Sequence, residues 1–144
     1  MSSLILIYRN YDNYNNEACV KYAYRTTPFY DVHLWPLENW EYGLPGSNIN
    51  YSFQGTNRGQ VTDTFSIVAS GFDWPTVAPT TVGPLAAAES ATMDIQVTIP
   101  ATVTLGFTDM VTITVTSQED SSKTGRANLT TFAGHVFFMP MVGK

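Results

Sequence analysis

The stretch Met93-Asp94-Ile95-Gln96-Val97-Thr98-Ile99 alternates apolar and polar residues at every position. Successive side chains of a β-strand point to opposite faces, so this order predicts a strand with one face buried and the other in water. Residues 111–116, Val-Thr-Ile-Thr-Val-Thr, repeat the scheme, and Ile49, Tyr51 and Phe53 follow it again. The polar positions are largely threonine, whose β-branched side chain suits a strand. These stretches predict half-buried antiparallel strands.

Turn signals separate these strands between Pro45 and Thr131. Asn57-Arg58-Gly59, Asp73-Trp74-Pro75 and residues 117–125 are rich in turn-forming residues, and Pro100 ends a strand because it has no backbone N–H. Only residues 85–91 could form about one helical turn. The order of strands and turns predicts an all-β fold, a β-sandwich, in which Trp74 belongs to the core.

Residue types are distributed unevenly along the chain. All eight tyrosines lie between Tyr8 and Tyr51, whereas most threonines follow Gly55. We therefore predict a Tyr/Asn-rich N-terminal arm over residues 1–44, a sandwich over 45–132 and a short apolar tail over 133–144. Weaker strand patterns occur at residues 4–8, 20–24 and 31–35 of the arm and at 135–139 of the tail. The arm is thus either a free extension or a set of added strands.

Charge and composition limit the classes of partner. The formal net charge is -5, and the seven Lys and Arg residues form no basic run, which argues against nucleic acid and anionic lipid as partners. No apolar stretch reaches transmembrane length, so membrane insertion is not expected. The single cysteine, Cys19, excludes an intrachain disulfide. The first residues lack the basic and apolar regions of a secretory signal, so none is expected.

Catalytic and metal-binding patterns are not found in the sequence. His33 and His135 stand apart from other metal-binding residue types, and Cys19 lies in an alternating stretch typical of a buried thiol. Glu38 and Glu41 flank Trp40 as in a sugar cleft, but nothing indicates the buried acid that glycoside hydrolysis requires. The sequence therefore predicts no enzymatic activity, no catalytic residues, no metal and no cofactor.

Eight stretches of the chain, taken in order, resemble a known family. They look like the bacterial immunoglobulin-like modules that occur beside glycosidases, in surface proteins and on phage virions. The resemblance implies an immunoglobulin-like antiparallel β-sandwich over residues 45–131. One departure is Ala87-Ala88, where the family usually has Pro-Gly; this leaves the turn geometry open, because glycine reaches positive φ cheaply and alanine does not. The matching stretches are residues 44–46, 51–59, 61–65, 74–75, 85–92, 97–100, 114–118 and 127–130.

The aromatic residues of the arm are the candidate interface. Tyr and Trp are enriched in protein interfaces, and so short a segment cannot bury this many against itself. An alternative is that Tyr22, Tyr24, Trp35 and Trp40 cover an open face of the sandwich as added strands. The candidate residues are Tyr8, Tyr11, Tyr14, Tyr22, Tyr24, Tyr30, Trp35, Trp40 and Tyr42.

Two functions follow from these features. The first is a structural protein of a virion surface, such as a capsid decoration subunit, which its arm holds to copies of itself or to a larger assembly. The second is an extracellular or cell-surface module in which Trp35, Trp40 and nearby tyrosines form a stacking platform for carbohydrate.

Overall fold

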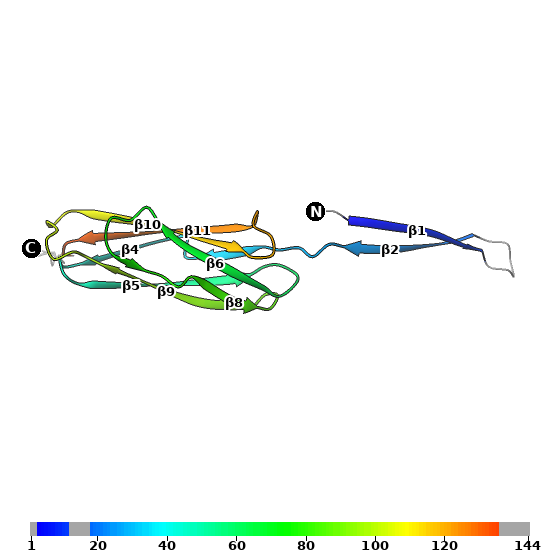
Figure 1. The fold of residues 1–144 in the computed structure, drawn as a ribbon, viewed down its shortest axis with the longest axis horizontal. Helices are drawn as coiled ribbons and strands as arrows, with labels where there is room; N and C mark the ends of the chain where they lie inside the picture. Colours follow the sequence, from blue (N-terminus) through cyan, green and yellow to red (C-terminus); the bar gives the residue numbers. More distant parts are fainter. Residues whose placement is uncertain (1–2, 12–17, 136–144) are drawn as a thin grey trace, which may run out of the picture.

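The protein consists of a β-sandwich and a separate N-terminal hairpin (Figure 1). The computed structural model describes residues 3–11 and 18–135, with side chains from Thr27 to His135. All elements in this part of the chain are strands. They are β1 (Ser3–Tyr11), β2 (Ala18–Thr26), β3 (Val32–Trp35), β4 (Glu38–Gly43), β5 (Asn48–Asn57), β6 (Asp63–Ser70), β7 (Thr76–Val77), β8 (Thr81–Leu85), β9 (Ser90–Thr98), β10 (Thr108–Ser117) and β11 (Thr124–Ala133).

Two sheets form the sandwich. The first has the order β4-β11-β10-β6-β8 and the second the order β3-β5-β9-β7. Neighbouring strands are antiparallel except for β4, which runs parallel to β11 at the edge of the five-stranded sheet. Figure 1 shows the strands of both sheets running along the long axis of the sandwich. The predicted all-β, immunoglobulin-like sandwich is confirmed.

The core lies between the sheets and consists of the apolar residues that alternate with polar ones along the predicted strands. Met93, Ile95 and Val97 on β9 are buried, and the register places them opposite Phe53, Tyr51 and Ile49 on β5. From the five-stranded sheet, β10 contributes Val111, Ile113 and Val115, all fully buried. Trp74 is also buried, as predicted from its place before Pro75. The alternating stretches therefore bury the faces that their sequence indicates.

The sandwich begins earlier in the chain than residue 45. Strand β3 pairs with β5 and β4 pairs with β11, so the sheets include two strands from the predicted arm. Val32 and Leu34 of β3 are buried in the core. Exposed Trp40 and Tyr42 on β4 obscured this role, because an edge strand with aromatic residues on its outer face lacks the usual alternation. The predicted boundary between arm and sandwich is therefore corrected from residue 45 to about residue 32.

Residues 86–89 form the turn in which the sequence departs from the family pattern. The Glu89 N–H donates to the Ala86 carbonyl at 3.0 Å, and Glu89 Oε2 accepts a hydrogen bond from the Ala86 N–H at 2.7 Å. The Ala88 N–H also donates to the Asn57 carbonyl at 2.8 Å. The chain keeps this turn by placing Ala88 at a φ of 67°, a left-handed conformation that favours glycine.

Replacing Ala88 by glycine is expected to raise the free energy of unfolding by about 0.5–1 kcal/mol, because the strain of a Cβ at positive φ is removed. Urea denaturation of both proteins measures the difference. Ala87→Gly is the matched control, since Ala87 is not among the residues at positive φ and the change only loosens the unfolded chain. Equal effects of the two substitutions would contradict the assignment of strain to Ala88.

Tyr51 joins the two sheets through its hydroxyl group. This group lies 2.7 Å from Thr131 Oγ1 and donates to the Thr130 carbonyl at 3.1 Å, both on β11. Tyr51→Phe is expected to lower the free energy of unfolding by about 1–2 kcal/mol at neutral pH, because buried partners lose a hydrogen bond. Chemical denaturation measures this loss, and Tyr42→Phe on the exposed side of β4 serves as the control.

The Tyr51→Phe difference is expected to shrink in alkali. Burial raises the pKa of Tyr51 above its usual value of 10.0. A raised folded-state pKa contributes stability that is complete below pH 10.0 and is lost as the pH rises through the folded value. Phenylalanine cannot ionise, so the variant keeps its own stability there. A difference that stays constant from neutral pH into strong alkali would contradict this prediction.

Candidate interaction site

The predicted interface residues are spread over the hairpin, the joint and both sheets of the sandwich. Tyr8 and Tyr11 lie on β1 and Tyr22 and Tyr24 on β2 of the hairpin, while Tyr14 is outside the described residues. Tyr30 lies in the joint between hairpin and sandwich. Trp35 lies on β3, and Trp40 and Tyr42 lie on β4. The alternative of added strands therefore holds for β3 and β4, whereas Tyr22 and Tyr24 belong to a sheet of their own.

The register of the hairpin gives it one strongly apolar face. Ile5 pairs with Tyr24, Ile7 with Tyr22 and Arg9 with Val20. Paired positions of antiparallel strands share a face, so these positions lie on one side of the ribbon, together with the pair Tyr11 and Ala18. The other face mixes apolar positions with Lys21 and Arg25. We call the first side the hairpin apolar face, defined by Ile5, Ile7, Val20, Tyr22 and Tyr24.

Charge also separates the hairpin from the sandwich. The paired positions of β1 and β2 include Arg9, Lys21 and Arg25 and no acidic residue. Residues 27–135 contain three basic and ten acidic residues, a formal net charge of -7. With Asp12 and Glu17 included, residues 1–26 have a formal net charge of +1, so the two parts still differ in the sign of their charge.

The outer face of the five-stranded sheet carries an aromatic patch. The register aligns Tyr42 with Phe132 and Trp40 with Thr130, which in turn pairs with Met110 on β10. Tyr42 and Phe132 stack with ring centroids 4.9 Å apart and planes at 19°. Trp40 is 63% exposed and Met110 55% exposed. We call Trp40, Tyr42, Met110 and Phe132 the outer aromatic patch.

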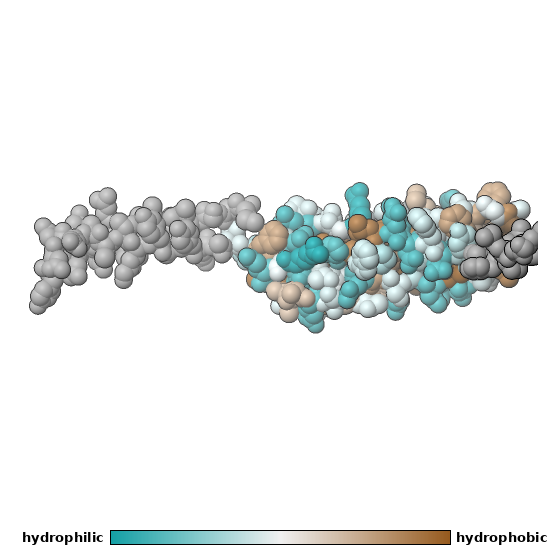
Figure 2. All heavy atoms as spheres, turned by 180° about the vertical axis from the view of Figure 1, so that it is seen from behind, coloured by the Kyte–Doolittle hydropathy of each residue, from teal (hydrophilic) through white to brown (hydrophobic). Residues whose placement is uncertain are grey.

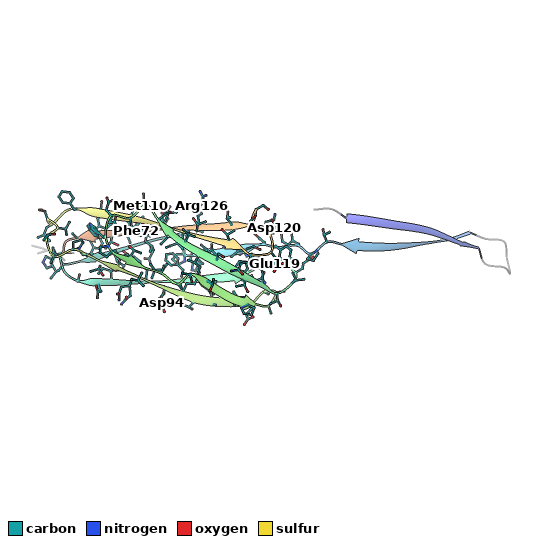
Figure 3. The ribbon with its side chains drawn as sticks, in the orientation of Figure 1. Phe72, Asp94, Met110, Glu119, Asp120 and Arg126 are labelled. Atoms are coloured by element: carbon teal, nitrogen blue, oxygen red, sulfur yellow. The ribbon has the colours of Figure 1, made fainter. Side chains whose placement is uncertain are left out.

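One acidic residue borders this patch. Glu38 is exposed and lies two positions before Trp40 on the same face of β4, whereas Glu41 alternates with Trp40 and Tyr42 and so lies on the other face of the strand. Phe72, 38% exposed, lies at the same end of the sandwich as Met110 (Figure 3). In Figure 2, the apolar residues visible on the sandwich are denser toward the end away from residue 27. The patch thus combines exposed rings with negative charge.

The outer face of the four-stranded sheet has a different surface. Its side chains pair across β5 and β9: Thr98 with Asn48 at 2.9 Å, Gln96 with Asn50 at 3.0 Å, and Ser52 with Asp94 at 2.6 Å. Thr56 and Ser90 continue this row, with oxygens 2.7 Å apart. These polar groups already satisfy one another, so this face offers a partner less than the patch does.

Trp35 lies on the polar face and not beside Trp40. Trp35 pairs with Gln54 on β5, and both residues are exposed on the outer face of the four-stranded sheet. Trp40 lies on the outer face of the five-stranded sheet. The predicted stacking platform of Trp35 and Trp40 is therefore wrong, because the chain crosses from one sheet to the other between β3 and β4. The two residues have nearly equal exposure, 64% and 63%, on opposite faces.

The joint between hairpin and sandwich is fixed by the loop after β5. The Arg58 N–H donates to the Asp31 carbonyl at 3.0 Å, and the Gln60 N–H donates to the Phe29 carbonyl at 2.8 Å. Gly59 lies so close that a Cβ there would be 2.8 Å from the Phe29 carbonyl oxygen. These contacts attach the base of the hairpin to one end of the sandwich.

An open pocket of about 390 Å³ lies at this joint between residues 27–30 and the β10–β11 loop. Lys123 Nζ sits 5.5 Å from the centre of the Phe29 ring, a cation–π distance. Hydrogen bonds from the Ser122 hydroxyl and N–H lower the pKa of Asp120, and Lys123 adds to the effect. The pocket has one cation and one carboxylate that already have partners, so it offers no catalytic arrangement.

Among residues 3–11 and 18–135, no three His, Cys, Asp or Glu side chains come together as a metal site would require. The same part of the chain has no helix long and apolar enough to span a membrane. Buried Asp63 accepts a hydrogen bond from Ser117 Oγ at 2.5 Å, but its Oδ1 atom has no partner. One carboxylate without neighbouring ligands does not form a cation site.

Comparison with solved structures shows the fold. The PapD-like domain 7 of human CEP192 is 12% identical, with a TM-score of 0.53 over 78% of this chain and 92% of that chain. The E. coli chaperone DraB is 15% identical, with a TM-score of 0.52 over 73% of this chain and 55% of that chain. The YadV chaperone is 12% identical, with a TM-score of 0.54 over 76% of this chain and 55% of that chain.

These similarities show that the chain shares an immunoglobulin-like β-sandwich fold with these proteins. No family model matches the chain, and no curated protein matches it by sequence. The resemblance to bacterial immunoglobulin-like modules therefore stays a prediction at the level of family. The chain spans about half the length of each chaperone.

Sequence reasoning missed two members of the patch, Met110 and Phe132. Both occupy the polar phase of their strands, where Thr112 and Thr114 follow Met110, and Asn128 and Thr130 precede Phe132. The sequence did contain a signal for them: each is a large apolar residue at an outward position of a strand whose other outward positions are mainly threonine. Their grouping with Trp40 depended on the parallel pairing of β4 and β11, which the sequence did not indicate.

Proposed function

We propose that this protein is a non-enzymatic assembly protein whose N-terminal hairpin binds a protein partner. One observation carries the proposal: β1 and β2 form a two-stranded sheet that extends from one end of the sandwich, with apolar positions gathered on one face (Figure 1). A single two-stranded hairpin is marginally stable in water. Packing of its apolar face on another protein would supply the missing stabilisation.

The sandwich supports this function as a rigid body. Among residues 27–135, whose burial the structure describes, the segment from Val32 to Ala133 supplies a core of its own between the two sheets. The structural neighbours include two chaperones, DraB and YadV, which is compatible with a binding or assembly role for this fold. The hairpin is thus available for a partner without loss of the fold.

We place the protein on a virion surface, as a decoration subunit of a phage capsid, because the family that the chain resembles includes such proteins. The genes next to the reading frame test this setting. A capsid or portal gene beside it is the expected result, and a secretion or glycosidase gene would favour an extracellular or cell-surface module.

Removal of residues 1–26 tests the role of the hairpin. The remaining chain, residues 27–144, is expected to stay folded, because every described core residue is retained. Its mass by light scattering is expected to be that of a monomer under conditions in which the full chain assembles. Thermal unfolding of both proteins is the control for folding. Equal assembly of the full and shortened chains would overturn the proposed function.

A carbohydrate-binding module is the second candidate, favoured by the exposed rings of Trp40 and Tyr42 on a sheet face. Such a module would use these two residues without Trp35, which lies on the opposite face. Glycan-array binding that Trp40→Ala abolishes and Trp35→Ala preserves would support it. Absence of binding to every glycan would remove this candidate.

A further inference from the structure

We propose that the hairpin of one copy packs its apolar face on the outer aromatic patch of a second copy, in a head-to-tail arrangement. This inference rests on the proposed function and names the partner: another molecule of the same chain. Three observations support it: the positions of the hairpin apolar face and the outer aromatic patch, the width of the patch, and the charges of the two parts.

The hairpin and the patch lie at opposite ends of the sandwich. The joint is attached beside Arg58 and Gln60, at the end where Asp120 lies (Figure 3). The patch lies at the other end, where the Gly134 N–H donates to the Gly43 carbonyl at 2.9 Å. In Figure 1 the hairpin continues away from that end. This placement directs the hairpin toward another molecule and away from the patch of its own sandwich.

The patch is wide enough to receive a two-stranded ribbon. The patch covers three adjacent strands, β4, β11 and β10, whose outer axes are about 10 Å apart at the usual strand spacing. A two-stranded ribbon laid on this area would pack as one sheet packs on another. The register puts the positions of Tyr22 and Tyr24 on one face of the hairpin, and the patch exposes Trp40 and Tyr42, residue types that suit such a contact.

Opposite charges favour the same arrangement. Arg9 shares the hairpin apolar face by register, and Lys21 and Arg25 lie on β2. The receiving sandwich, residues 27–135, has a formal net charge of -7, and Glu38 lies on the same face of β4 as Trp40. Basic and acidic surfaces attract at encounter and select one orientation. The face around Asn50 and Asp94 consists mainly of polar side chains of β5 and β9 that already pair with one another, and its exposed ring is Trp35. The patch exposes Trp40 and Tyr42 and is therefore the better receptor.

A contact between two different surfaces of identical molecules has a structural consequence. Each copy gives a hairpin and offers a patch, so such contacts continue from molecule to molecule and close into a ring or extend as a filament.

The charges at the contact have a second consequence. Assembly of the full chain is expected to weaken as the salt concentration rises, because salt screens the attraction between the basic hairpin strands and the acidic sandwich.

The test uses two variants of the full chain. Trp40→Ala breaks the patch and keeps the hairpin, whereas the double variant Ile5→Thr/Ile7→Thr breaks the hairpin apolar face and keeps the patch. Threonine retains the β-branch, so strand propensity is preserved. Each variant alone is expected to need at least about tenfold more protein to assemble, as loss of a central aromatic or apolar anchor usually requires. An equal mixture is expected to form a dimer of one copy of each, measured by light scattering.

Matched controls separate this contact from general loss of apolar surface. Trp35→Ala removes an equally exposed tryptophan from the opposite face, and Leu4→Thr/Leu6→Thr makes the same chemical change on the other face of the hairpin. Both controls are expected to assemble more strongly than their counterparts. Circular dichroism and thermal unfolding of each variant verify that the sandwich is folded.

The outcomes distinguish this inference from the proposed function. A Trp40→Ala variant that assembles like the unchanged chain would overturn the patch as receptor and point to contacts between hairpins. A full chain that is monomeric at all concentrations would overturn the second copy as partner, yet leave binding of the hairpin to a different protein open to direct measurement on capsids. Assembly that persists without residues 1–26 would overturn both.

Discussion

Replacing Asn57 by alanine is expected to lower the free energy of unfolding by about 3–5 kcal/mol, because three backbone groups lose a hydrogen bond in a buried setting. The Asn57 side chain is fully buried. Its Nδ2 donates to the carbonyls of Val61 at 2.8 Å and Leu85 at 2.9 Å, and its Oδ1 accepts from the Gly59 N–H at 2.8 Å. Alanine offers none of these groups.

Urea denaturation measures this loss, and Asn50→Ala provides the matched control. Asn50 is exposed and accepts one hydrogen bond from Gln96 at 3.0 Å, so its removal is expected to cost no more than about 0.5 kcal/mol. Hydrogen exchange adds a local readout. The amides of Arg58 and Gln60, which bind the joint at Asp31 and Phe29, are expected to exchange faster in Asn57→Ala. Equal losses in the two variants would contradict the role given to Asn57.

Alternation made the centre of the sandwich predictable. In residues 93–99 and 111–116 the inward phase is entirely apolar and the outward phase mainly polar, so burial of one face decides both strand and orientation. Trp74 was predictable for a similar reason, since a large ring before Pro75 at the end of a strand-like run fits the core. These are local signals that act within a few residues.

The edges of the sheets could not be predicted in the same way. Strand β4 has no fully buried residue, and its membership in the five-stranded sheet depends on parallel pairing with β11, about ninety positions later in the chain. Residues 4–8 and 20–24 showed weak strand patterns. These patterns did not indicate that the two strands would form a sheet of their own, separate from the sandwich. The outer aromatic patch depends on the pairing of β4 with β11, which explains why Trp35 and Trp40 were grouped together from sequence.

Buried polar residues were equally hidden. Asn57 was interpreted as a turn residue; it is the last residue of β5 and accepts a hydrogen bond from Gly59 in the turn that follows, yet its bond to Leu85 spans twenty-eight positions. Asp109 was not singled out at all, although it is only 5% exposed. A polar residue inside the core is specified by distant partners, so no pattern of neighbours in the sequence marks it.

Asp109→Ala is expected to lower the free energy of unfolding by about 3 kcal/mol, because its carboxylate holds two backbone N–H groups of the loop that carries Trp74. Oδ1 accepts from the Asp73 N–H at 2.9 Å, and Oδ2 accepts from the Trp74 N–H at 3.2 Å. Loss of both bonds frees the backbone on which the buried Trp74 ring depends. Denaturation measures the energy, and a red shift of tryptophan emission reports exposure of Trp74.

Two further variants separate the hydrogen bonds from the charge. Asp94→Ala removes the same charge from an exposed carboxylate that accepts from Ser52 Oγ, so its cost is expected to stay within about 0.5 kcal/mol. Asp109→Asn retains one acceptor oxygen and should fall between the unchanged protein and Asp109→Ala. If Asp94→Ala and Asp109→Ala were equally destabilising, charge and not the anchoring of the Trp74 loop would be the cause. If Asp109→Ala alone shifts the emission, the loop beside Met110, and with it one border of the outer aromatic patch, is held in place by this single buried carboxylate.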